Sequence, residues 1–122
     1  MTAKNKDTNT NLNILKEKVR NFIEERGWSP YHTPKNLIQA LQIEAAELSE
    51  ILLFKNDELD QILNNKQLMS QLSDEIADVL IYLLNLVNCL KIDLTSAFFK
   101  KMEKNAEKYP SDEFNNGFYY KK

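Results

Sequence analysis

Residues 73–87 of this 122-residue chain read SDEIADVLIYLLNLV and carry its strongest structural signal. The first half places acidic and apolar side chains at helical spacing, and residues 79–87 contain no charged side chain. A helix that is apolar almost all round has to be covered on several sides. Because so short a chain offers few neighbours, we expect a second subunit to supply part of the cover.

The same helical periodicity extends outward from this stretch in both directions. Thr33 and Pro34 form a strong start signal, an N-cap followed by a proline in the first turn. Asp93 is a second candidate N-cap, and Pro110 ends the last helix. Residues 56–67 fit either a short helix or a mobile connector. The main helices are predicted over residues 12–26, 34–55, 68–90 and 94–109.

These elements predict an all-α protein, an antiparallel four-helix bundle over residues 11–110. Residues 1–10 are polar and read as a disordered arm, and residues 111–122 form a short aromatic tail. Two glycines and three prolines are too few for a fold of many strands and turns.

Composition excludes several classes of function. A net charge of −2 argues against a dedicated nucleic-acid binder. The apolar run over residues 79–87 is too short to span a bilayer. A single cysteine, with no signal-peptide pattern near the start, predicts a cytoplasmic protein.

The charge is unevenly distributed. Residues 44–78 hold nine acidic side chains against two lysines, and the segments on either side are basic. Within this acidic segment, two carboxylate pairs have i, i+3 spacing, which places each pair on adjacent faces of a helix. On both helices the pair borders the apolar stripe. The pairs are Glu44 with Glu47, and Glu75 with Asp78.

If the two helices pack through their apolar stripes, these four carboxylates converge, and their repulsion calls for a cation. Ligation by oxygen alone suits Mg²⁺, with Mn²⁺ as an alternative. Zinc and iron are poorly supported because the chain has one histidine and one cysteine. The competing interpretation is an ordinary solvated helix face. Glu50 and Asp74 lie farther from the stripes and are weaker candidates.

The two pairs, Glu-x-x-Glu and Glu-x-x-Asp, resemble the motif of the MazG-like all-α nucleoside triphosphate pyrophosphohydrolases. Flanking residues extend the resemblance from about Leu12 to Pro110: WSPYHTPKNL, ELSEILLFK, DVLIYLLNL and KMEKNAEKYP look like the small dCTP pyrophosphatase branch. The resemblance implies a Mg²⁺-dependent enzyme that converts a nucleoside triphosphate, dCTP or a related pyrimidine nucleotide, to the monophosphate and pyrophosphate. It also implies a homodimer or, more strongly, a homotetramer built as a dimer of dimers.

By this resemblance Glu44, Glu47, Glu75 and Asp78 bind the metal, and Glu47 is our first choice for activating the water.

The last helix adds a further clue, because Lys101, Asn105 and Lys108 share one face with Leu94 and Phe98. The resemblance implies that the three polar residues bind the substrate phosphates. A lysine near a helix C-terminus is also favoured by the helix dipole alone, which is the competing interpretation for Lys108.

The resemblance also implies a base pocket formed by Trp28, His32, Phe54 and Tyr82. Two positions depart from the dCTP-specific relatives, which commonly carry tryptophan in place of Phe54 and histidine in place of Val19. The base preference is therefore open.

Two alternatives remain at this stage. One is a related all-α pyrophosphatase that acts on dUTP or phosphoribosyl-ATP. The other is a non-catalytic helical interaction module whose acidic residues bind a structural cation or a basic partner.

Overall fold

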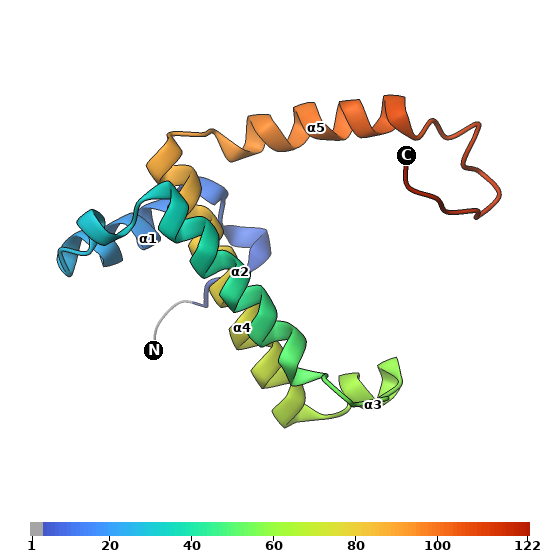
Figure 1. Cartoon of the computed structure of the whole chain (residues 1–122), viewed down its shortest axis with the longest axis horizontal. Helices are drawn as coiled ribbons and strands as arrows, with labels where there is room; N and C mark the ends of the chain where they lie inside the picture. Colours follow the sequence, from blue (N-terminus) through green and yellow to red (C-terminus); the bar gives the residue numbers. More distant parts are fainter. Residues whose placement is uncertain (1–3) are drawn as a thin grey trace. The chain divides into compact units, whose positions relative to one another are not determined.

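The computed structural model describes residues 4–122, and these form helices and connecting turns without a β-strand. The chain divides into two compact units, residues 1–91 and 92–122, which are described separately. Figure 1 shows the helices in chain order. Their bounds are η1 (Asp7–Asn9), α1 (Leu12–Glu25), η2 (Ser29–Tyr31), α2 (Pro34–Ile51), α3 (Leu59–Leu63), α4 (Lys66–Leu90) and α5 (Leu94–Lys108).

The all-α class and the four long helices are confirmed. The expected arm over residues 1–10 includes residues 1–3, which lie outside the described part of the chain. In the rest of the arm, η1 forms one short turn, in which the Lys6 amide donates to Asn9 Oδ1 at 2.8 Å.

The first unit is built on α2 and α4, which lie side by side and run in opposite directions (Figure 1). Of the described residues, the two most deeply buried large side chains lie on these helices: Leu37 on α2 at 1% exposed and Leu84 on α4 at 2%. Thr33 caps α2 as predicted, because its hydroxyl accepts a hydrogen bond from the Asn36 amide at 3.2 Å. Asn65 caps α4 by accepting from the Leu68 amide at 3.0 Å.

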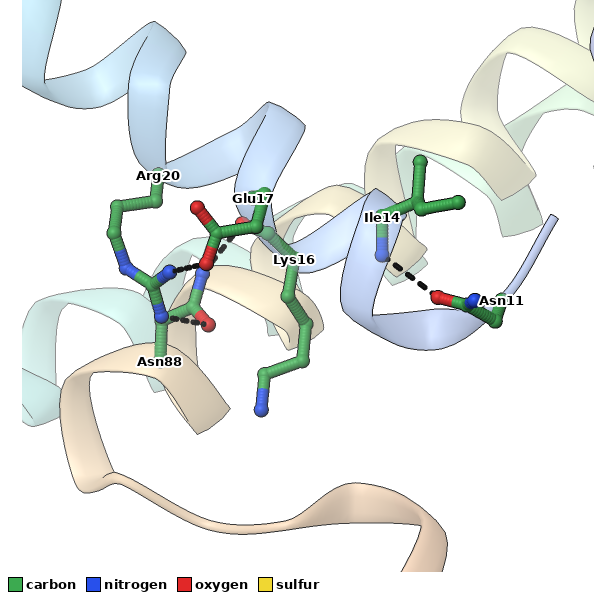
Figure 2. Close-up of polar contacts among 6 residues, drawn as sticks. All are labelled: Asn11, Ile14, Lys16, Glu17, Arg20 and Asn88. Atoms are coloured by element: carbon green, nitrogen blue, oxygen red, sulfur yellow. Dashed lines mark hydrogen bonds and ion pairs between the residues drawn. The ribbon is translucent and has the colours of Figure 1, made fainter.

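Helix α1 packs against α4 through apolar and polar contacts. Val19 and Ile23 are its buried residues. Asn88 on α4 accepts a hydrogen bond from Arg20 at 3.1 Å and donates one to the Lys16 carbonyl at 3.0 Å. Figure 2 shows this contact, in which Arg20 is also paired with Glu17. The amide of Asn88 therefore ties two turns of α1 to α4.

The predicted end of the second helix at residue 55 is wrong. Helix α2 ends at Ile51, and the amides of Leu52 and Leu53 then bond three residues back, to Ser49 and Glu50. Phe54 has a left-handed backbone with φ of 60°, which stops helix propagation. No glycine or proline marks this turn in the sequence.

In the second unit, Asp93 occupies the N-cap position of α5 as predicted. Its carboxylate makes no capping bond to the backbone and instead accepts from the Ser96 hydroxyl at 2.9 Å. The tail folds on itself: the ring centroids of Tyr109 and Phe114 lie 5.2 Å apart, and those of Phe114 and Tyr120 lie 4.8 Å apart.

Many large apolar side chains of the first unit remain exposed. Ile43 is 58% exposed and Ile76 is 56% exposed, although both lie on the two helices that form the core. Ile81, within the apolar stretch over residues 79–87, is 44% exposed. This stretch is therefore only partly covered by its own chain.

We expect Leu37→Ala to lower the free energy of unfolding by about 2–5 kcal/mol, because it removes buried contacts and leaves a cavity at a fully buried position of α2. The neighbouring Ile38→Ala is the matched control, since Ile38 is 43% exposed. Urea denaturation followed by circular dichroism measures both. Equal losses from the two variants would contradict the assigned interface.

Candidate functional site

The central feature of the first unit is a carboxylate cluster, which we define as Glu44 of α2 with Glu75 and Asp78 of α4. One carboxylate oxygen from each residue lies within 4.8 Å of the others. All three side chains are half-buried. The predicted convergence of the two helices through their acidic edges is thus confirmed for these three residues.

Two oxygens of the carboxylate cluster are buried without a hydrogen-bond partner: Oε2 of Glu44 and Oε2 of Glu75. Buried polar atoms are normally paired, and unpaired carboxylate oxygens are the most costly kind. A positively charged ligand would pair with these oxygens. No lysine, arginine or histidine of the described residues forms an ion pair with this cluster.

The electrostatics of the cluster are clearest at Glu44, whose pKa is raised from 4.5 to about 7. Burial is the largest cause, and the negative charge of Glu47 is the next. Asp78 adds further repulsion. A protonated Glu44 can also donate to the carboxylate of Glu47 or Glu75, which raises the pKa as well.

The donor set fits a hard divalent cation. Three carboxylates supply only oxygen ligands, and two of these ligands lack any other partner. Magnesium and manganese prefer such ligands and retain several water molecules. Glu44, Glu75 and Asp78 would hold the ion.

Glu47 lies close to the carboxylate cluster but outside it. Its side chain is exposed. It lines a shallow cleft of about 520 Å³ together with Glu75, and Glu50 lines the same cleft. The role of Glu47 as a ligand or base stays a prediction. Asp74 is exposed, as expected for the weaker candidate.

A second cleft, of about 380 Å³, opens beside the cluster and includes Asp78 in its wall. We call it the aromatic cleft. Three of the four side chains expected to contact a base line it: Trp28, His32 and Tyr82. The rings of Trp28 and His32 lie 6.4 Å apart between centroids. Val19 adds an apolar surface.

The structure does not bring Phe54 to the aromatic cleft. Its side chain is 95% exposed in the turn after α2, where the left-handed backbone directs the chain away from the helix. Its expected role in base binding remains a prediction.

Lys101, Asn105 and Lys108 lie on α5 in the second unit, as expected. Asn105 is half-buried and the two lysines are exposed. Phe98, which shares their predicted face, is 57% exposed.

Sequence reasoning missed two residues of the aromatic cleft. Phe22 packs edge-on against Trp28, with ring centroids 5.8 Å apart. Asn85 is 8% exposed and is hydrogen-bonded to His32. The sequence does contain a signal for Asn85, because an amide side chain within an otherwise apolar helix needs a hydrogen-bond partner when it is buried.

A pH effect on stability follows from Glu44. Between pH 4.5 and about 7 the folded chain retains a proton that the unfolded chain has released, so stability falls as the pH rises through this range. We expect Glu44→Gln to be more stable than the wild type at pH 8 without divalent cations, with little difference at pH 4.5. Thermal denaturation at both pH values measures this.

The control is Glu50→Gln, which removes an exposed carboxylate from the same helix. Adding Mg²⁺ at pH 8 should stabilise the wild type and leave Glu44→Gln almost unchanged. A variant that gained no stability at pH 8 would contradict the repulsion assigned to the cluster.

Comparisons with known proteins agree with this geometry. The MazG-like family model matches residues 40–120. The chain is 38% identical over 91 residues to dCTP pyrophosphatase 1 of Rattus norvegicus, covering 73% of this chain and 53% of the relative. It is 37% identical over 91 residues to dCTP pyrophosphatase 1 of Homo sapiens, covering 74% and 54%. The chain therefore spans about half the length of the curated relatives it matches.

A crystal structure of a pyrophosphatase from Archaeoglobus fulgidus is also similar. Its TM-score is 0.73 at 37% sequence identity, and the match covers 90% of this chain and 98% of that one. The fold is helical, and its paired acidic motifs converge. The family model matches most of the sequence. This chain belongs to the MazG-like family.

Proposed function

We propose that the chain is a nucleoside triphosphate pyrophosphohydrolase that depends on Mg²⁺, with Mn²⁺ as a substitute. Its substrate is dCTP or a related pyrimidine nucleotide, and water converts this to the monophosphate and pyrophosphate. The observation that carries the proposal is the carboxylate cluster beside the aromatic cleft, with Asp78 common to both. The names of the curated relatives and of the similar crystal structure support the reaction type.

The roles of the acidic residues follow from their positions. Glu44, Glu75 and Asp78 hold the cation, which when bound neutralises charge on the phosphates and on the leaving pyrophosphate. Glu47 is exposed next to the cluster, where it can accept a proton from the attacking water.

The polar residues of α5 bind the phosphates in this proposal. Lys101 and Lys108 supply charge, and Asn105 supplies amide hydrogen bonds. The match to the MazG-like family model over residues 40–120 includes α5 as well as the acidic motifs.

The base occupies the aromatic cleft. Trp28 and Tyr82 provide flat surfaces for it, and His32 provides a polar group. The volume of about 380 Å³ lies in the range of small-molecule sites.

A homodimer or a dimer of dimers is part of the proposal. Ile43, Ile76 and Ile81 are each more than two-fifths exposed on α2 and α4. Burying such side chains against a second copy would stabilise the helices that carry the carboxylate cluster. The described residues contain no helix that is both long and apolar enough for a membrane span.

A nucleotide panel with Mg²⁺ tests the reaction. We expect pyrophosphate and the monophosphate from dCTP, with lower activity on dUTP and phosphoribosyl-ATP, as measured by ion-exchange chromatography of the products. Asp78→Asn and Glu75→Gln should lower kcat/KM by at least about 100-fold, the scale seen when charge stabilisation of a transition state is removed.

Asp74→Asn is the matched control, because Asp74 is an exposed acid on the same helix outside the cluster. Release of the diphosphate and inorganic phosphate would contradict the proposed bond cleavage. Full activity of Asp78→Asn would reject the assigned ligands.

A separate prediction concerns the phosphate-binding residues. Lys101→Ala should raise KM by about tenfold, because a charge-assisted hydrogen bond to phosphate is lost. Lys100→Ala changes the neighbouring exposed lysine and serves as the control. Steady-state kinetics with dCTP measures both variants, and an equal effect of the two would indicate only a general loss of positive charge.

A further inference from the structure

Two clefts of the first unit share one wall, in which the polar side chains are those of His32 and Asn85 and the apolar one is that of Ile23. On one side lies the aromatic cleft, with Trp28 and Tyr82. On the other side is a smaller, more polar cleft of about 200 Å³, lined by Arg20 and other polar residues. His32 and Asn85 are not part of the carboxylate cluster. The hydrogen bond between them therefore needs a separate explanation.

The hydrogen bond within the pair has a defined direction. Asn85 Nδ2 lies 2.8 Å from His32 Nδ1, and an amide nitrogen can only donate. Nδ1 must therefore accept, and a neutral imidazole then carries its proton on Nε2. Asn85 is 8% exposed, which shields this bond from competing water.

The backbone of His32 is held as well. Its amide donates to the Ser29 carbonyl at 3.1 Å, within the η2 turn. Its carbonyl accepts from the Cys89 thiol of α4 at 3.7 Å. Helix α4 thus fixes both the ring and the main chain of a residue that lies in a connector.

We propose that Asn85 is a positioning residue that makes His32 a hydrogen-bond donor through Nε2–H, so that the aromatic cleft selects a nucleobase by an acceptor on its edge. The inference rests on the proposed function, which places the base in this cleft. Cytosine offers two adjacent acceptors, O2 and N3, whereas uracil carries a hydrogen on N3. Because O2 is an acceptor in both bases, the pair favours cytosine over uracil through an Nε2–H that faces N3.

The tautomer can be measured directly, because His32 is the only histidine of the chain. Nitrogen-15 NMR of the imidazole should show Nδ1 without a proton and Nε2 with one in the wild type. Asn85→Ala should shift the Nδ1 resonance as its hydrogen bond is lost, whereas Asn88→Ala should leave it in place. A wild-type ring protonated at Nδ1 alone would overturn the proposal.

Kinetics then tests selection of the base. The ratio of kcat/KM for dCTP to that for dUTP should fall by about tenfold in Asn85→Ala, since one oriented hydrogen bond is lost. The change should appear in KM, with kcat for dCTP nearly unchanged. Asn88→Ala is the control, because Asn88 is a partly buried amide one turn along α4 that binds Arg20 and the Lys16 carbonyl instead.

A double-mutant cycle separates positioning from a general structural effect. In a His32→Ala background, Asn85→Ala should no longer change the ratio, because Asn85 acts through the ring. Asn85→Leu, which keeps a similar volume but has no donor, covers the case in which Asn85→Ala fails to fold. An unchanged ratio in a folded Asn85 variant would overturn the proposal. A wild-type protein that hydrolysed no nucleotide would instead overturn the proposed function, and with it any preference for a base.

Discussion

The repulsion among Glu44, Glu75 and Asp78 is the constraint on which the first unit depends. Their oxygens are held within 4.8 Å of one another, and two of these side chains have a buried oxygen without a partner. Carboxylates free to move would separate. They stay together because α2 and α4 pack against each other, and the burial of apolar side chains such as Leu37 and Leu84 offsets the electrostatic cost. Burial is the largest cause of the raised pKa of Glu44, and the charges of Glu47 and Asp78 raise this pKa further.

The helices are well suited to maintain this arrangement. Side chains three residues apart stay on adjacent faces of a helix, and the Thr33 and Asn65 caps define where α2 and α4 begin. A cation at the cluster would turn the repulsion into attraction and add to stability. Ligand binding and folding are then coupled through the same three side chains.

Much of this could be predicted from the sequence because it follows from local periodicity. The wheel positions of Glu44 and Glu75, at the edge of apolar stripes, were sufficient to predict that they converge. The end of α2 could not be predicted, because Phe54 adopts a left-handed backbone without a glycine to signal it. Trp28, His32 and Tyr82 were expected together by family resemblance, and the structure places them in one cleft. The Asn85–His32 bond joins residues 53 positions apart, and no local pattern encodes such a pairing.

Helix α4 carries two kinds of side chain along neighbouring turns. Glu75 and Asp78 belong to the carboxylate cluster, whereas Tyr82 and Asn85 line the aromatic cleft, with Asp78 common to both. Because a turn of helix separates the two sets, a substitution at position 82 or 85 can alter the cleft without moving the acidic residues. The connector that precedes α2 supplies Trp28 and His32. A scaffold of this kind can keep one arrangement of carboxylates while the side chains that line the aromatic cleft vary.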